Sequence, residues 1–368
     1  MEVSGRIRRR SLLAGVALLT FALSASAASA RDCETSKSGA IRSDAGHSEE
    51  LIVMSAFDGS DYEILAMAPD GGGLRALTNT TEDEFSPRIS PDGTRIVFSR
   101  RPREFSPHEG IFTMSINGLG TTKIVRHAGR DWHPAWTPNG RIVFASDRSG
   151  NWNLYIKTIG RHGARRLAGA RGFSPDVSSS DPRKVVFERR ERKHHHAPWI
   201  LDLVSGKMTS LGLPTGYYPR WSPDGRVILF EAGCCVDPEP VWTDLYTVMP
   251  GARRVDHVEP NEPLVYHRQG DWSPDGTRIA FLVQGDQDGD PTDVAIAEFP
   301  DTAGTEHIVR RVGIPNTASG WNVSGLDWGR VVARPRVPRR TFLESSAYVA
   351  PEESRGRGKI GVRRPRGF

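Results

Sequence analysis

The sequence predicts an all-β protein, and three repeated features carry that prediction. A Ser-Pro-Asp-Gly tetrapeptide occurs three times, at residues 90–93, 222–225 and 273–276. A short β-branched run ending in Phe follows each copy, and a Pro-x-Trp pattern or part of it precedes most of them. Strand–turn–strand units repeated in this way are typical of an architecture built from many small sheets.

The tetrapeptide has the chemistry of a tight turn between antiparallel strands. Ser in first place, Pro in second and Gly in fourth suit a type I turn. Pro presets φ, the Asp side chain can accept nearby backbone N–H groups, and Gly takes φ > 0. Residues 137–140 (Thr-Pro-Asn-Gly) are a close variant and residues 179–182 (Ser-Ser-Asp-Pro) a degenerate one. We therefore expect five strand pairs joined by such turns.

The run after each turn is apolar at consecutive positions, as it would be in a strand buried on both faces. The five runs are residues 95–98, 141–144, 184–187, 226–230 and 278–281. A propeller blade is buried on both faces because it lies between two neighbouring blades. Third strands are expected at 154–156, 199–201, 245–248 and 294–296, and fourth strands at 74–78 and 123–125.

The repeat spacing sets the number of blades. The position taken by Trp in the full pattern falls at residues 89, 136, 177, 221, 272 and 328, which is 47, 41, 44, 51 and 56 residues apart. Residues 51–55 look like a second strand without a first, and residues 325–329 like a first strand without a blade. Pairing the two would remove the exposed sheet edges. The prediction is a six-bladed β-propeller of four-stranded antiparallel blades, with the first blade closed by the C-terminal strand.

The pattern Pro-x-Trp-Ser-Pro-Asp-Gly-x-x-Ile-x-Phe resembles the PD40 repeat of WD40-like, TolB-like propellers over roughly residues 50–330. TolB itself has a separate α/β domain before its propeller. Only about twenty residues separate the proposed leader from the first strand here. We therefore expect a TolB-like propeller without the N-terminal domain of TolB, and this difference puts binding of the TolB partner Pal in doubt.

The first thirty residues have the pattern of an export signal. Arg6 and Arg8–Arg10 precede an apolar stretch over residues 12–23, and Ala28-Ser29-Ala30 has the form of a cleavage site. The stretch is short for a membrane span, and Arg9-Arg10 resembles a twin-arginine signal. The expected organisation is a signal peptide over 1–30, a linker over 31–49, a propeller over 50–332 and a disordered basic tail over 333–368. A retained N-terminal anchor is the alternative.

The net charge of +5 does not belong to the folded part. Residues 1–30 contribute 4 − 1 = +3 and residues 334–368 contribute 10 − 3 = +7, so residues 31–333 carry 5 − 3 − 7 = −5. A nucleic-acid partner is not expected, because its basic footprint would lie on the folded face. The tail is either a solvated extension or a tether attracted by charge to anionic envelope polymers or lipid surfaces.

The cysteines leave their pairing open. Export would permit a disulfide. The adjacent pair Cys234-Cys235 is poorly placed to bond to itself, and Cys33 could pair with either of them or with neither.

The chain carries no Gly-x-Ser-x-Gly, His-Glu-x-x-His, P-loop or Cys-x-x-Cys motif. We expect an exported, periplasmic or extracellular, non-catalytic and monomeric propeller without a cofactor. It would bind a protein, peptide or glycan of the cell envelope at one face. The alternative is a metal-dependent lyase or hydrolase acting on carbohydrate in the channel. That alternative rests on a resemblance to TolB-like lyases that use His and Gln, for which His133, His267 and Gln269 are the comparable residues.

Residues just before each first strand should meet at one mouth of the channel, where convergent polar and aromatic groups could bind a ligand. The predicted ligand-binding residues are Glu84, Asp131, Trp132, His133, Tyr217, Tyr218, His267 and Arg268. A weaker metal candidate is Asp286, Asp288 and Asp290, which match the start of a calcium loop. Pro291 and Ala297 stand where that loop needs Gly and Glu.

The leader generates the first testable prediction, which is export with cleavage after Ala30. N-terminal sequencing of secreted protein should read Arg31-Asp32, and a protein that still begins at Met1 would contradict the prediction. Changing Arg9 and Arg10 together to Lys should block export if the twin-arginine route is used, whereas unchanged export would indicate the general secretory route.

Overall fold

A computed structural model describes residues 48–102, 109–127, 129–192, 195–233, 243–252, 254–258, 265–285, 292–299, 310–312 and 323–332. The chain divides into two compact units, 1–45 and 46–368, and every described residue belongs to the second. The predictions for the leader, the three cysteines, residues 286–290 and the basic tail lie outside the described residues. Within those ranges no helix is long and apolar enough to cross a bilayer.

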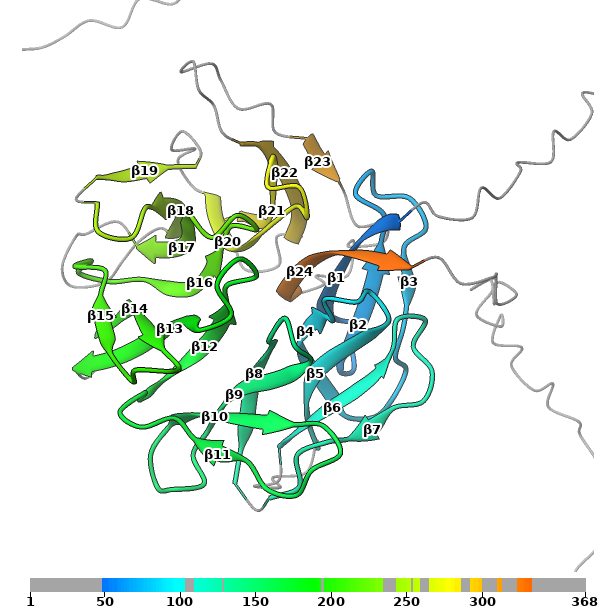
Figure 1. The fold of residues 1–368 in the computed structure, drawn as a ribbon. Helices are drawn as coiled ribbons and strands as arrows, with labels where there is room; N and C mark the ends of the chain where they lie inside the picture. Colours follow the sequence, from blue (N-terminus) through cyan, green and yellow to red (C-terminus); the bar gives the residue numbers. More distant parts are fainter. Residues whose placement is uncertain are drawn as a thin grey trace, which may run out of the picture. The chain divides into compact units, whose positions relative to one another are not determined.

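Six four-stranded antiparallel sheets follow one another around a ring (Figure 1). Blade 1 consists of β4 (Asp83–Ile89), β5 (Arg95–Arg101), β6 (Gly110–Ser115) and β7 (Thr122–Lys123). Blade 2 consists of β8 (Asp131–Trp136), β9 (Arg141–Ser146), β10 (Asn153–Thr158) and β11 (Arg165–Arg166). Blade 3 consists of β12 (Gly172–Val177), β13 (Lys184–Arg192), β14 (His195–Asp202) and β15 (Met208–Ser210). Blade 4 consists of β16 (Tyr217–Trp221), β17 (Ile228–Gly233), β18 (Thr243–Val248) and β19 (Val255–His257). Blade 5 consists of β20 (Val265–Trp272), β21 (Arg278–Gly285), β22 (Thr292–Glu298) and β23 (Arg310–Val312). The sixth blade is made by β24 (Val323–Val332), β1 (Ser48–Phe57), β2 (Tyr62–Met67) and β3 (Arg75–Ala76). The predicted fold class is confirmed.

The repeated tetrapeptide forms the expected turn between the first two strands of its blade. In the first copy the Gly93 N–H donates to the Ser90 carbonyl oxygen at 2.8 Å, and Gly93 has φ of 66°. The Ser90 hydroxyl donates to Asp92 at 2.6 Å and accepts from the Arg95 N–H at 2.9 Å. The other Ser-Pro-Asp-Gly copies repeat these contacts, so the sequence repeat reflects a repeated hydrogen-bond pattern.

The core lies between blades, where the second strands are covered on both sides. The Phe that ends each apolar run is fully buried in four blades, at Phe98, Phe144, Phe187 and Phe281. Trp136, Trp221, Trp272 and Trp328 are also buried, each in an apolar cluster. Dense apolar packing at each junction explains why the Trp position recurs with the repeat.

Ring closure joins the two ends of the propeller. β24 pairs antiparallel with β1, and Ile52 lies opposite Trp328 in the register. Figure 1 shows β24 (orange) beside β1 (blue) although some 270 residues separate them in the sequence. Leu326 and Trp328 pack with Ile52 and Met54 and with residues of blade 5. The last strand therefore completes one sheet and also covers the neighbouring blade.

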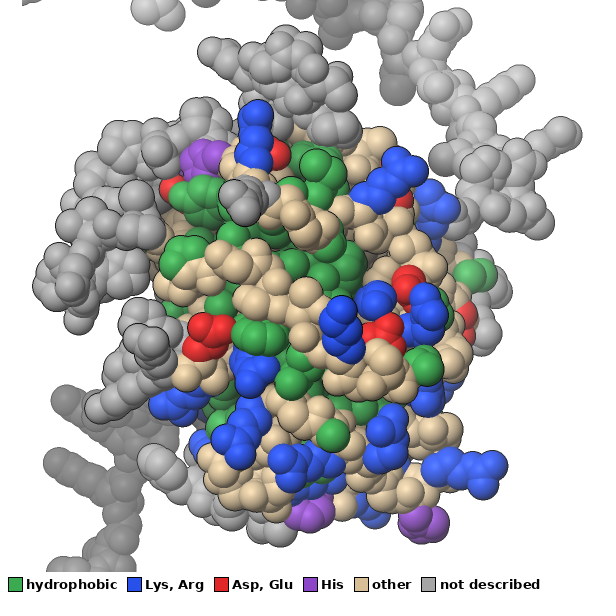
Figure 2. Space-filling model, turned by 60° about the vertical axis from the view of Figure 1, so that its left-hand side comes forward, with side chains coloured by type: hydrophobic (Ala, Val, Ile, Leu, Met, Phe, Trp, Pro, Cys, Tyr) green, Lys and Arg blue, Asp and Glu red, His purple; other side chains and the backbone are tan. Residues whose placement is uncertain are grey.

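The surface of the propeller is not uniformly charged. Figure 2 shows basic side chains spread over the face drawn, and acidic ones are fewer there.

Closure predicts different outcomes for two truncations. Deleting residues 320–368 removes β24 and should lower the free energy of unfolding by more than ~5 kcal/mol, because buried Leu326 and Trp328 are both lost. Deleting only residues 336–368 keeps β24 and should change stability little. Thermal midpoints measured side by side test this, and equal midpoints for the two truncated proteins would contradict closure through β24.

Candidate functional site

Each inner strand carries one residue in the left-handed region, at the same place in every blade. Five are the only non-glycine residues with positive φ among those described, with φ from 46° to 51°, and the sixth is Gly325 at 62°. The set is Ser86, His133, Ser174, Tyr218, Gln269 and Gly325. In the first five blades the register to the second strand shifts at this point, as in a β-bulge. Such a conformation costs about 1–3 kcal/mol at a non-glycine residue and is concentrated at functional sites.

Gly325 is the one position of the six where a side chain has no room. A Cβ there would lie 2.9 Å from the backbone of Ser86 in the next blade. The seam between the last and first blades therefore requires glycine, both for its φ and for this close approach.

All six residues line one cavity at the centre of the ring, with a volume of about 220 Å³. Phe85, Arg101, Glu109 and Trp132 add to its wall, and Arg88 and Arg220 also line it, two residues further along their strands than the left-handed positions. The cavity is smaller than the ~300–1,000 Å³ that encloses a typical small-molecule ligand. It has room for one or two side chains of a partner.

A layer of buried charges crosses the channel two residues after each left-handed position. It contains Arg88, Asp176, Arg220, Asp271 and Asp327, with Ala135 in the second blade. Arg88 Nη1 lies 2.6 Å from Asp327 Oδ1 and 3.4 Å from Asp271 Oδ2, and its Nη2 lies 3.8 Å from Asp176 Oδ1. One guanidinium thus joins carboxylates from three blades.

Burial and the neighbouring charges in this layer shift the pKa values of its titratable groups. Burial, together with the negative charge of Asp327, raises the pKa of Asp271 to about 8. Burial and then the charge of Arg88 lower the pKa of Arg220 to about 10. Burial alone would lower the pKa of Arg88, but the three carboxylates outweigh it and raise that pKa above its usual value.

Two donors of this layer have no hydrogen-bond partner among the described residues. They are Arg88 Nη2 and Arg220 Nε, both buried. Because an unsatisfied buried donor is costly, each of these groups favours a nearby acceptor such as a bound water molecule.

His133 and Tyr218 face each other across the cavity wall with ring centroids 6.0 Å apart in an edge-on arrangement. Enclosure in the channel and then the charges of Arg220 and Arg88 lower the pKa of His133 to about 3, so its imidazole is neutral at physiological pH. Burial, then the charge of Glu231, raises the pKa of Tyr218, which keeps its hydroxyl protonated. Both rings can therefore take part in neutral hydrogen bonds and in stacking.

The predicted ligand-binding residues divide into groups. Trp132, His133 and Tyr218 line the cavity. Tyr217 lies one residue before the left-handed position and packs on the His196 ring at 5.6 Å. Arg268 is exposed, with Nε 3.9 Å from Glu231 Oε1. These last two side chains are outside the cavity lining.

The other three predicted residues are buried and paired, Glu84 and Asp131 within their own blades and His267 with a residue of the neighbouring blade. Glu84 Oε1 lies 2.7 Å from Arg100 Nε, and Asp131 Oδ1 accepts from Arg148 at 2.6 Å. His267 Nδ1 lies 3.1 Å from Asp244 Oδ1, and its side chain is 2% exposed. These contacts tie strand ends together, and His267 does not join His133 and Gln269 at the channel.

No three His, Cys, Asp or Glu side chains of the described ranges are grouped as a metal site would require. The Ser174 hydroxyl lies 3.4 Å from His133 Nδ1 and 3.3 Å from Glu188 Oε2, but Ser174 is only 1% exposed. The channel cavity therefore has polar groups suited to binding, whereas the one Ser–His contact at its wall is buried.

Sequence reasoning missed the charged layer and three of the left-handed residues, Ser86, Ser174 and Gly325. A usable signal was present in the middle residue of the Pro-x-Trp pattern. Because successive side chains of a strand point to opposite sides, a Trp between blades places the residue before it toward the channel. That residue is Arg88, Asp176 or Arg220 in three blades.

The chain was compared with known proteins by sequence and by structure. No family model matches it. It is 30% identical over 146 residues to the TolB homologue of Chlorobium luteolum, which is 39% of this chain and 32% of that protein. It is 29% identical over 176 residues to the Tol-Pal system protein TolB of Francisella tularensis subsp. mediasiatica, which is 46% of this chain and 40% of that protein. The matched region is less than half of either relative.

Solved structures of the same fold extend the match over most of the ring. TolB from Acinetobacter baumannii superposes with a TM-score of 0.61 at 15% identity, covering 76% of this chain and 66% of that one. A putative TolB from Agrobacterium tumefaciens gives 0.53 at 15% identity, covering 78% of this chain and all of that one. With the six closed blades and the sequence matches, these likenesses show that the chain is a TolB-like β-propeller.

Proposed function

We propose that this chain is an exported, non-catalytic propeller that binds a protein or peptide partner by inserting partner side chains into the channel mouth. The observation that carries the proposal is the cavity of about 220 Å³, to which each of the six blades contributes one left-handed residue. Backbone strain repeated at the same place in five blades is a mark of function. The size of the cavity suits anchor side chains better than a whole small molecule.

The chemistry of the wall supports the same proposal. Trp132 and Tyr218 are of the types enriched at the centres of protein interfaces, because their rings bury much area at low entropic cost. On the floor, the guanidinium groups of Arg88 and Arg220 could attract a carbonyl or carboxylate of the inserted group. An aromatic wall above a floor of donors matches a partner residue with an apolar body and an acceptor at its tip.

Binding is favoured over catalysis at this site. The buried Ser174 has no open approach as a nucleophile, and the neutral His133 is held between it and Tyr218. Three of the matched relatives are named Tol-Pal system protein TolB, and the first thirty residues of this chain have the pattern of an export signal. We therefore propose a periplasmic or extracellular location, an envelope protein or peptide as the partner, and a monomeric propeller.

The test is a double substitution, His133→Ala with Tyr218→Ala, in protein with the leader removed. A partner captured from an envelope fraction by the unmodified protein should bind this variant with about 30-fold lower affinity, since two hot-spot contacts together contribute over ~2 kcal/mol. Titration calorimetry gives the affinities, and the thermal midpoint shows whether the variant is folded.

The matched control is Arg226→Ala with Arg254→Ala, two side chains that are 82% and 86% exposed and lie outside the cavity lining. The control should bind as the unmodified protein does. A folded channel variant with unchanged affinity would contradict the proposed site, as would equal losses in both variants.

A further inference from the structure

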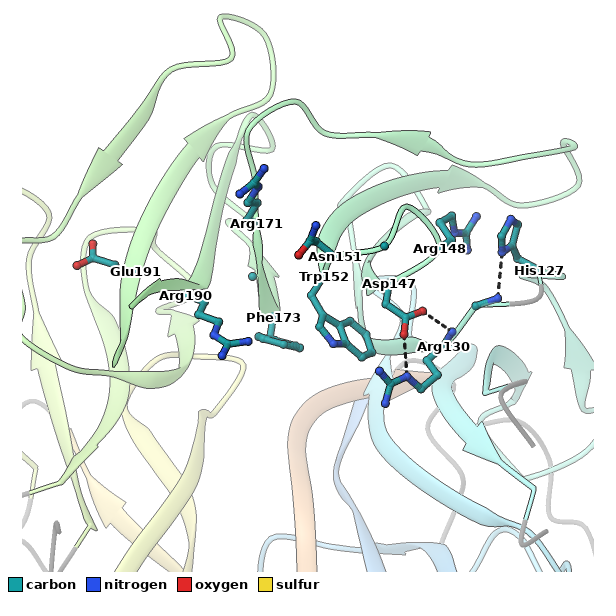
Figure 3. Close-up of a pocket in the computed structure, with 13 residues that line it drawn as sticks. His127, Arg130, Asp147, Arg148, Asn151, Trp152, Arg171, Phe173, Arg190 and Glu191 are labelled. Carbon is teal, nitrogen blue, oxygen red and sulfur yellow. Dashed lines mark hydrogen bonds and ion pairs between the residues drawn. The ribbon is translucent and has the colours of Figure 1, made fainter. Parts of the chain in front are cut away.

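A second and larger cavity, of about 790 Å³, opens beside the channel between blades 2 and 3 (Figure 3). Four stretches of chain line it: residues 127, 129 and 130 before β8, the β9–β10 connection from 147 to 152, and residues 171–173 and 190–191, both in blade 3. Its volume lies in the range of ~300–1,000 Å³ that encloses a small organic ligand. We call it the side groove.

Guanidinium groups surround the side groove. Arg130, Arg148, Arg171 and Arg190 line it, together with the acidic side chains of Asp147 and Glu191. Arg171 and Arg190 are exposed, and neither has an ion pair with any residue that the structure describes. Both acids already have partners, since Asp147 Oδ2 accepts from Arg130 at 2.7 Å and Glu191 Oε1 from the Trp199 indole at 2.7 Å. Two cations without an ion-pair partner among the described residues thus line the groove.

The floor of the side groove is aromatic. Trp152 and Phe173 lie with ring centroids 5.0 Å apart, and Figure 3 shows them between Arg130 and Arg190. The Arg130 guanidinium is 5.1 Å from the Trp152 ring centroid, which holds one edge of this floor in place. Both rings are only partly buried, so they present apolar surface to whatever enters.

We propose that the side groove binds an oligosaccharide that carries carboxylate groups. Guanidinium forks match carboxylates in a bidentate geometry, which assigns Arg171 and Arg190 to the charged groups of the ligand. The apolar C–H face of a sugar ring can cover Trp152 and Phe173, and the burial of that surface favours binding. Asn151 and Asp147 offer an amide and a carboxylate for ring hydroxyls. A small inorganic anion would use the cations and leave the aromatic floor bare.

This site is separate from the channel mouth and does not rest on the function proposed for it. Trp132 lines the channel, Trp152 lines the side groove, and the two rings pack together with centroids 4.6 Å apart. This tilted pair of rings lies where the two cavities adjoin. Each can therefore be tested without disturbing the other.

The experiment measures binding of a mannuronate tetrasaccharide to the leaderless protein by calorimetry at 150 mM salt. Arg171→Gln with Arg190→Gln should weaken binding at least about 10-fold, because both carboxylate partners are removed. Arg165→Gln with Arg166→Gln is the matched control. It removes the same charge from two exposed residues of β11 outside the groove, and it should change affinity less than about twofold, since screened surface charges contribute little.

Three further arms decide the class of ligand. The methyl ester of the same tetrasaccharide should bind far more weakly, tetraglutamate should bind more weakly than the sugar, and the His133→Ala, Tyr218→Ala variant should bind the sugar normally. Equal losses in the groove and control variants would overturn the proposal in favour of diffuse charge attraction. Undiminished binding of the ester, binding of tetraglutamate as tight as that of the sugar, or no binding by the unmodified protein would each overturn it as well.

Discussion

The buried guanidinium of Arg88 is the contact on which the arrangement of the ring depends. It lies on the innermost strand of blade 1 and faces Asp327, Asp271 and Asp176, which come from three other blades. The same carboxylates accept backbone N–H groups across blade junctions, as Asp327 does from Ile89 at 2.7 Å. Removing one partner from such a set leaves an uncompensated charge, so these contacts oppose any separation of the four inner strands that they join.

Fixed inner strands allow the layer above to be strained. Each inner strand bulges two residues before the charged layer and places a side chain such as His133 or Tyr218 in the left-handed region. A flexible loop would relax out of that conformation, whereas a strand held on both sides of the bulge cannot. The channel mouth is thus preorganised by the contacts beneath it, and a partner would lose little free energy in ordering it.

The fold could be predicted from the sequence because its signals are local and repeated. Turn chemistry at residues 90–93 and its copies, followed by apolar runs, fixes strand pairs without knowledge of distant contacts. The site was predicted only in part, because topology places Glu84 at the mouth of the channel but does not reveal that Arg100 binds it inside the blade. The side groove has no sequence signal at all, since Arg130, Trp152 and Arg190 belong to separate segments that meet only in the folded ring.

The most direct measurement is a double-mutant cycle on the central ion pair, with the free energy of unfolding taken from urea titration. Arg88→Met should lower that free energy by ~3–5 kcal/mol. Combining it with Asp327→Asn should cost at least ~1 kcal/mol less than the sum of the single changes, because the partners are in contact. Arg226→Met, at a side chain 82% exposed, should change it by less than ~0.5 kcal/mol. Additive effects, or a loss at Arg88 no larger than at Arg226, would contradict the claim that this cluster holds the ring together.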